Sequence, residues 1–426
     1  MSKANVSIKL ILLLICLYQL GCGVVIGTAV DATISVATYP FKEYIFNEAY
    51  KYDNTWEDDY KTVRVKKEPG KLLLGIAVSG GGSRSAYFTA CILEEISKIP
   101  VSPGSKVKYV DEIDYMSSVS GGSLASAYFC LKKYQNNKNQ KKFYTRFKKD
   151  MKQNFQIKAF GHYTIGGNWL LDFLTYYDRG DLMANVWDKS FFNKATFKDL
   201  AKAEKNGAPR LIINGTNLND GLKFVFSNVP DDEFNDSQYF VNMRNSGFIK
   251  HAITREHEPF KIVGFQGINS DIQQYRISKA VAASASVPNL LGPVTLKDYT
   301  KKGRERLIHI VDGGVYDNYG IESLMQVFTK YLDKHPGTQA KIIVIDGSGY
   351  FKEIEKHTDT FTVAEYSERP LSIAWLRTKA YMEFIFKKAK KFRNKEGKYP
   401  YKNLNFELLS LYGILPSQKK QKTIVN

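Results

Sequence analysis

The chain has 426 residues, of which 43% are hydrophobic, as in an ordinary folded globule with one large or two moderate domains. Four cysteines without metal-ligand or disulfide spacing exclude a disulfide-stapled framework. The 61 basic and 43 acidic residues give a net charge of +18, which favours either an anionic partner surface or simply a solvated basic face.

The first feature in chain order is an apolar segment with the layout of an export signal. Lys3 and Lys9 precede the apolar run Leu10–Leu17, and Cys22 follows it at the position where a bacterial lipoprotein is lipidated. Gln19 stands where such signals usually carry leucine, so the pattern is an imperfect match.

Three interpretations of this segment stay open. Cys22 is lipidated, the chain is cleaved near Ala29, or Leu10–Val30 is retained as a membrane anchor, since it is uncharged and long enough to span a bilayer. Each places the protein outside the cytoplasm or at a membrane. We therefore assign 1–22 as a signal or anchor segment and 23–70 as an N-terminal arm.

Two strand-turn-helix units follow the arm. Such an alternation predicts an α/β fold with parallel strands. The first unit turns at a triple glycine, Gly80–Gly82, and the second turns at Ser120. The strands and helices expected here are Leu72–Val78, Ser85–Ile96, Ile113–Val119 and Ser123–Tyr134.

The rest of the chain continues this alternation. A turn at Asn217–Gly221 joins two strands in a hairpin, and a small-residue helix and two buried strands come later. These later elements are Ser278–Ala285, Leu307–Val311 and Lys341–Ile345. We assign 71–350 as the catalytic domain.

Two stretches combine basic and aromatic residues, namely 132–155 and the tail from Leu371, which belongs to a basic amphipathic extension at 351–426. One interpretation is that they lie on anionic lipid with their aromatic rings at the headgroup level. The other is that each is a solvated helix or loop.

Ser120 has the surroundings of a catalytic nucleophile. A serine at a sharp strand-to-helix turn stands clear of its neighbours when small residues lie two before and two after it, here Ser118 and Gly122. Such a run on its own is also typical of an ordinary strand-to-helix turn.

The glycine run adds specificity, because consecutive glycines let backbone amides converge on the oxyanion of acyl transfer at a helix start. Gly80, Gly81 and Gly82 are the oxyanion candidates, and Arg84 supports their loop or attracts a phosphate. A nucleotide-binding loop is disfavoured because no Lys-Ser/Thr follows the glycines.

Asp312 is the candidate base, at the end of a strand and before Gly313 and Gly314. A carboxylate can deprotonate serine only if it is held against the hydroxyl in a partly dry cleft that raises its pKa. The alternative role is that of a structural turn aspartate.

Along the chain the glycine run comes first, the turn at Ser120 second and Asp312 with its two glycines third. In this order, the three motifs resemble those of the patatin-like phospholipases. The resemblance covers Leu72–Gly347 and includes Ala282–Pro288 and Asp312–Gly320. It implies a three-layer α/β/α fold with a mainly parallel sheet, a Ser–Asp dyad and hydrolysis of acyl-lipid esters. It also implies the site residues, with Ser120 as nucleophile, Asp312 as base, Gly80, Gly81 and Gly82 as the oxyanion hole, and Arg84, Gly121, Gly122, Gly313 and Gly314 in support.

A Ser–Asp–His triad is a further possibility because His335 and His357 follow Asp312, but both lie in polar stretches typical of surface histidines. We expect no metal and no cofactor. The expected partners are a phospholipid or other acyl lipid and an anionic membrane surface, but no nucleic acid, because nucleic-acid binding would leave the glycine and serine motifs unexplained. The alternatives are a short-chain carboxylesterase and a non-catalytic membrane-anchored protein.

Overall fold

The computed structural model describes residues 72–135, 140–153, 179–245, 260–288, 292–300, 306–349 and 363–411. The expected signal or anchor segment, the N-terminal arm, Cys22 and His357 lie outside these ranges. No helix within the described ranges is both long and apolar enough to cross a bilayer.

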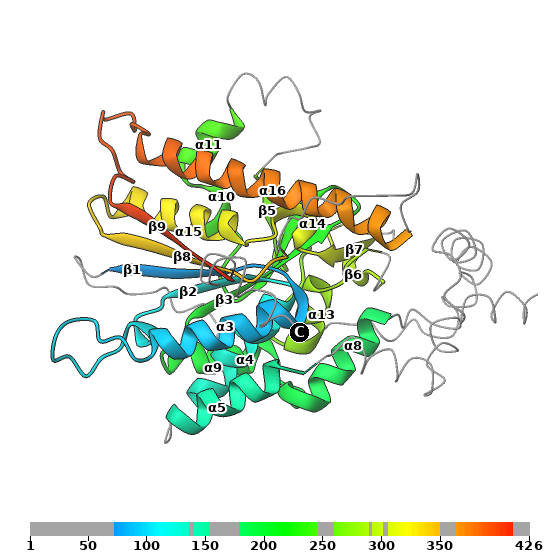
Figure 1. The fold of residues 1–426 in the computed structure, drawn as a ribbon. Coiled ribbons are helices and arrows are strands. Elements are labelled where there is room, and N and C mark those ends of the chain that lie inside the picture. The colour runs from blue at the N-terminus through cyan, green and yellow to red at the C-terminus, as the bar shows by residue number, and fades with distance from the viewer. Residues whose placement is uncertain are drawn as a thin grey trace, which may run out of the picture.

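The described strands form one nine-stranded sheet (Figure 1). Its main path runs β5-β4-β3-β2-β1-β8-β9, and β7 joins it through β3 and carries β6. The strands are β1 Leu73–Val78, β2 Tyr115–Val119, β3 Arg210–Asn217, β4 Leu222–Ser227, β5 Ile262–Val263, β6 Val294–Asp298, β7 Arg306–Asp312, β8 Ala340–Asp346 and β9 Leu404–Ser410.

The centre of the sheet is parallel. Strands β3, β2, β1, β8 and β9 pair in parallel, whereas β4 and β7 both run antiparallel to β3. The strand that carries Asp312 therefore enters the sheet against the direction of its parallel core, which the strand-helix alternation did not reveal.

Helices cover both faces of the sheet, so the predicted three-layer α/β/α fold is confirmed (Figure 1). The helices are α3 Gly82–Ile96, α4 Gly121–Gln135, α5 Gln140–Met151, α8 Arg179–Trp187, α9 Phe197–Lys205, α10 Asp232–Asn235, α11 Gln238–Arg244, α13 Ile277–Ser284, α14 Gly314–Asp317, α15 Ile321–Lys334 and α16 Val363–Lys390. A short 3₁₀ helix, η2 Tyr109–Asp111, and a π-helical segment, η3 Asp188–Phe192, complete the set.

Each face of the sheet has its own hydrophobic core. Alternate residues of one strand point to opposite faces. In β1, for example, Leu74 and Ile76 join the core beneath α3, α4 and α5, whereas Leu73 and Ala77 join the core beneath α15 and α16. Strands β1, β2 and β3 are therefore buried along their whole length, as expected for a sheet covered on both sides.

The C-terminal extension packs on the same body. Helix α16 buries Met382 and Ile385 in the core of α15, and β9 adds a parallel edge strand to β8. The proposed boundary near residue 350 therefore does not separate two sheets, although the extension's role stays a prediction.

Helix α5 corrects one expectation about the stretch 132–155. Its aromatic residues Tyr144 and Phe147 are buried, and Phe147 stacks on Tyr128 of α4 with ring centroids 5.1 Å apart. These rings fill the core and are not exposed to meet a lipid headgroup. The exposed basic residues of α5 form the polar face of an amphipathic helix, and their contact with lipid stays a prediction.

Candidate active site

Strand register brings Ser120 and Asp312 together. Strand β2 pairs with β3 as far as Val119 opposite Asn214, and β7 pairs with β3 from Asp312 opposite Gly215. The two strands therefore approach along β3 from opposite directions and end one position apart. Ser120 follows the end of β2 directly, and Asp312 is the last residue of β7.

Ser120 occupies a tight left-handed turn between β2 and α4. Its φ of +53° is rare for a residue with a side chain and lets the chain reverse sharply into the helix. Its amide donates to Ser284 Oγ at 2.9 Å, and its carbonyl accepts from the Ser123 amide at 2.8 Å. Its hydroxyl lies near enough to the Asp312 carboxylate to lower the pKa of that carboxyl.

Asp312 is a buried carboxyl with an altered acidity. Burial raises its pKa from 3.8 to about 6, although a hydrogen bond from the Gly314 amide, at 2.7 Å, and the nearby Ser120 hydroxyl oppose this rise. Near neutral pH it is mainly ionised yet a stronger base than an ordinary aspartate, which is the acidity that proton abstraction from serine needs.

The glycine loop after β1 lies directly against the serine turn. A Cβ on Gly121 would stand 2.0 Å from the Gly82 carbonyl oxygen, and a Cβ on Gly122 would stand 2.6 Å from the Ser79 carbonyl oxygen. Only glycine fits at either position. Gly81 and Gly82 have φ values of +137° and +61°, so both need glycine for their backbone as well.

The three oxyanion candidates differ in whether their backbone amide already donates a hydrogen bond within the protein. The Gly80 amide donates to the Asn318 carbonyl at 2.9 Å, which ties the glycine loop to the segment after Asp312. For the amides of Gly81 and Gly82, the described residues provide no recorded acceptor.

Arg84 links the glycine loop to the loop after β8. Its Nε donates to the Gly347 carbonyl at 3.1 Å, and the Gly347 amide donates to Ser79 Oγ at 2.9 Å. The Gly347 oxygen also leaves no room for a side chain on Gly81. Arg84 is otherwise exposed, so its contact holds the loop in place from outside.

The turn after Asp312 is as crowded as the turn at Ser120. A Cβ on Gly313 would stand 2.4 Å from the Asn214 carbonyl oxygen, and one on Gly314 would stand 3.0 Å from Asp312 Oδ1. Trp375 of α16 donates its indole N–H to the Gly314 carbonyl at 2.6 Å. The C-terminal extension therefore contacts the turn that carries the carboxylate.

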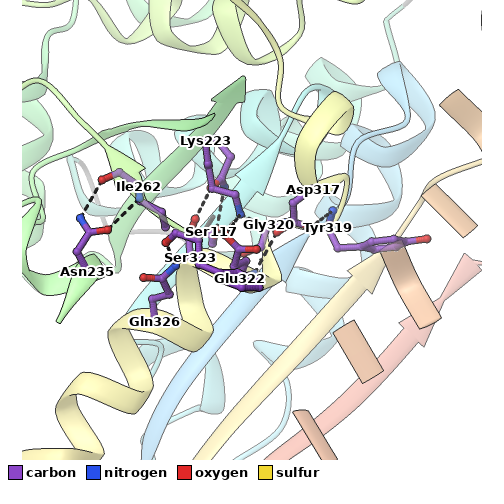
Figure 2. Close-up of polar contacts among 12 residues, drawn as sticks. Ser117, Lys223, Asn235, Ile262, Asp317, Tyr319, Gly320, Glu322, Ser323 and Gln326 are labelled. Atoms are coloured by element: carbon purple, nitrogen blue, oxygen red, sulfur yellow. Dashed lines mark hydrogen bonds and ion pairs between the residues drawn. The ribbon is translucent and has the colours of Figure 1, made fainter. Parts of the chain in front are cut away.

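A buried polar cluster fixes the segment beyond this turn (Figure 2). Lys223 Nζ of β4 lies 2.8 Å from Asp317 Oδ2, and both side chains are fully buried. Asp317 also accepts hydrogen bonds from the amides of Tyr319, Gly320 and Glu322. Burial alone would raise the pKa of Asp317, but the ammonium and the amides outweigh it and hold that pKa below its ordinary value.

Glu322 is the third member of the cluster, 3.9 Å from Lys223. Burial raises its pKa to about 7, with only partial relief from Lys223. A single ammonium thus faces two carboxyls, of which Asp317 has the short contact and keeps the charge.

Sequence reasoning missed the lysine-centred cluster, Ser284 and Trp375 as neighbours of the site. Ser284 Oγ receives the Ser120 amide and donates to the Asn214 carbonyl at 2.6 Å, so it bridges the nucleophile to β3. Its signal was present in the run Ala282–Pro288. Nothing in the local sequence marks Lys223 or Trp375, because their partners are distant along the chain.

The histidines of the described chain do not contact this pair. His309 lies beside Asn219, with Nδ1 3.2 Å from Oδ1, and His335 packs on the Tyr331 ring. No group of three or more His, Cys, Asp or Glu side chains in the described ranges is arranged to hold a metal ion.

The fold and these motifs define an α/β protein with a serine at a sharp strand-to-helix turn beside a glycine-rich loop. The chain belongs to the patatin-like phospholipase family, whose model matches residues 76–325. Patatin-like phospholipases act on lipids, and membership supports lipid acyl hydrolysis at the level of the family. No curated protein matches the sequence.

The solved structures that are similar to this chain include a human phospholipase and a bacterial protein. Human GIVD cytosolic phospholipase A2 is 13% identical, with a TM-score of 0.37 over 75% of this chain and 47% of that one. VipD from Legionella pneumophila is 14% identical, with a TM-score of 0.27 over 83% of this chain and 64% of that one. The chain thus spans about half the length of the human enzyme.

Proposed function

We propose that this protein is a lipid acyl hydrolase of the phospholipase A or lysophospholipase type, with Ser120 as nucleophile and Asp312 as base. One observation carries the proposal: pairing along β3 brings Ser120 next to the buried Asp312 carboxyl, whose pKa burial raises to about 6. A serine hydroxyl reacts only when a nearby base accepts its proton, and no imidazole of the described chain takes that place.

The reaction has two steps. Asp312 accepts the hydroxyl proton as Ser120 Oγ attacks the ester carbonyl, and the resulting tetrahedral intermediate collapses when the alcohol leaves with that proton. Water then gives its proton to Asp312 and attacks the acyl-serine, which releases the fatty acid and restores the hydroxyl.

The amides of Gly81 and Gly82 stabilise the oxyanion in this proposal. They begin α3, where the helix dipole favours negative charge, and they adjoin the serine turn. Gly80 has a positioning role, since its amide is bonded to Asn318. Arg84, Gly121, Gly122, Gly313 and Gly314 hold the two turns in contact.

Labelling with a fluorophosphonate tests the nucleophile. We expect the wild-type protein to be labelled at Ser120, and Ser120→Ala and Asp312→Asn each to lose lipid hydrolysis by about 10³-fold or more while folding normally. Ser118→Ala is the matched control, because its buried hydroxyl in the same turn bonds to the Ile212 carbonyl instead. Full activity in Ser120→Ala or Asp312→Asn contradicts the assignment.

A chain-length series of esters separates the alternatives. A phospholipase or lysophospholipase prefers long acyl chains presented in vesicles or micelles, and a short-chain carboxylesterase prefers soluble short esters. A protein that neither labels nor hydrolyses any ester is the non-catalytic alternative.

We expect the protein to act at a membrane surface, either after export from the cytoplasm or while held there by its N-terminal segment. Mass spectrometry of the N-terminal peptide from the mature protein distinguishes lipidated Cys22, cleavage near Ala29 and an intact Leu10–Val30 segment.

A further inference from the structure

Helix α16 presents two different faces. One face buries Met382, Ile385 and Ala389 against α15 and β9. The opposite face carries Ile373, Leu376 and Phe384, which we call the α16 ridge, at 47%, 50% and 55% exposure. Residues spaced by three and eight positions lie on one side of a helix, so the ridge is a continuous apolar strip.

Basic side chains flank the α16 ridge. Arg377 in the middle of α16, Lys387 and Lys388 near its end, and Lys391 just after it are exposed. Lys387 Nζ also pairs with Glu383 Oε1 at 2.6 Å. Lys388 Nζ lies 5.4 Å from the centre of the Phe384 ring, which places a positive charge directly beside the apolar strip. The strip therefore combines apolar side chains with a cationic margin, in a chain of net charge +18.

The ridge lies on the helix that contacts the candidate active site. Trp375, on the opposite side of the same helical turn, donates to the Gly314 carbonyl, and Lys379 Nζ bonds to Asp346 Oδ2 at 3.0 Å. Figure 1 shows α16 lying over the sheet, with its N-terminal half toward β7 and α14. The ridge therefore lies on the side of α16 that faces away from these contacts with the site.

We propose that the α16 ridge docks on an anionic lipid bilayer, with Ile373, Leu376 and Phe384 in the headgroup–acyl boundary and the basic residues on the lipid phosphates. Amphipathic helices with an apolar strip and basic flanks bind bilayers in this way. The docking itself does not depend on the proposed function. A role of the docking in bringing lipid substrate to the site does rest on that function.

A second copy of the chain fits the ridge less well. Its three side chains offer roughly 300 Å² of surface, against about 800 Å² per partner in a stable dimer. A two-fold contact would also set Arg377, Lys387 and Lys388 of one copy against the same charges of the other. Charge complementarity selects an anionic partner.

Vesicle binding of the full chain tests the docking, in the Ser120→Ala background so that lipid is not consumed. The variant Ile373→Ser/Leu376→Ser/Phe384→Ser is compared with Ile99→Ser/Val107→Ser/Leu218→Ser, whose apolar side chains are 49%, 43% and 53% exposed elsewhere. On phosphatidylglycerol-containing vesicles we expect about tenfold or greater weakening for the ridge variant only.

The charges are tested separately. Arg377→Gln, Lys387→Gln and Lys388→Gln together should weaken binding by about fivefold per charge on anionic vesicles and little on pure phosphatidylcholine. The matched control replaces Lys142, Arg146 and Lys149 of α5 by Gln, and its binding should stay near the parent value.

Photocrosslinking tests directly whether the ridge itself touches lipid. Benzoylphenylalanine at position 384 should photocrosslink to vesicle acyl chains, whereas the same residue at position 218 should not. Equal crosslinking at both positions, or equal binding losses in the ridge and control variants, overturns the proposal. If the ridge variant binds vesicles normally but changes the oligomeric state of the protein in the absence of lipid, the proposal is overturned and the ridge is an interface with a second copy of the chain.

The two proposals fail separately. If the wild-type protein hydrolyses neither vesicle lipid nor a soluble ester, the proposed function fails while the binding and crosslinking results still decide the docking. If hydrolysis of vesicle lipid is normal in the ridge variant and position 384 does not crosslink, the docking fails and the proposed function stands.

Discussion

The turn after β2 and the turn after β7 meet on β3 but are held by different interactions. The serine turn is held by shape, because Gly121 and Gly122 press on the backbone of the glycine loop with no room for a Cβ. The aspartate turn is equally crowded, but it also depends on charge, because Lys223 and Asp317 anchor the segment that follows it. Close backbone packing does not depend on pH, whereas a carboxyl cluster does. The difference implies that the two halves of the site fail under different perturbations.

The largest effect should come from breaking the charged anchor. Lys223→Met leaves Asp317 as an uncompensated buried carboxylate and should lower the free energy of unfolding by about 3–5 kcal/mol in urea titrations. Adding Asp317→Asn removes the charge but keeps an oxygen for the amides of Tyr319 and Gly320. The double variant should therefore be more stable than Lys223→Met, and a double variant that is less stable would contradict the charge argument.

The second effect concerns Asp312 itself. Its pKa is about 6 in the folded protein and 3.8 when exposed, so the folded state holds the proton more tightly. Its contribution to stability is full below about pH 4 and is lost as pH rises through about 6, to a total of about 3 kcal/mol. Asp312→Asn lacks this loss. Between pH 4 and pH 7.5, the unfolding free energy of the wild-type protein should therefore fall relative to that of the variant by most of that amount. A pH-independent difference would show that the carboxyl titrates normally.

The serine turn should respond to volume. Gly121→Ala forces its new methyl group into the Gly82 carbonyl and should cost about 1–3 kcal/mol of stability. Because a displacement of about 1 Å disturbs the reacting geometry, ester hydrolysis should fall about 100-fold. Gly104→Ala is the control: its φ of +79° makes the substitution cost some stability as well, but its new Cβ meets no atom within 4 Å, so its activity should stay near the parent value. An equal loss of activity in both variants would exclude the contact as the cause.

The smallest effect is expected at Ser284, whose hydroxyl links the serine turn to β3. Ser284→Ala removes the acceptor of the Ser120 amide and should cost about 1 kcal/mol and lower kcat about tenfold. Ser286→Ala removes a hydroxyl of the same segment that bonds to the Ala282 carbonyl, so it should affect stability alone. If both variants lose kcat equally, Ser284 has no positioning role for the nucleophile.

Local sequence predicted the parallel core well because each of its elements carries its own signal. Strand β1 has no polar side chain, β8 contains the apolar run Ile342–Ile345, and the turns at Gly80 and Ser120 are marked by small residues. The antiparallel direction of β7 has no such signal, because it depends on which strand β7 meets rather than on its own residues.

The same reason explains the other differences. Lys223 lies in a strand pattern that would suit a surface lysine, and only its partner Asp317, 94 positions later, makes it a core residue. Helices α5 and α16 look alike in composition, yet α5 turns its aromatic rings inward and α16 leaves Phe384 outside. Packing against distant elements decides both cases.

Strands β2 and β7 approach each other along the same edge of β3 from opposite directions. The distance between the two reactive groups therefore depends on the register of each strand against β3. Sliding β7 by a single residue against β3 would turn the carboxylate toward the opposite helical layer, since successive side chains alternate faces. Insertions and deletions inside β7 should thus be selected against more strongly than those in the connections before it, however well the rest of the molecule folds.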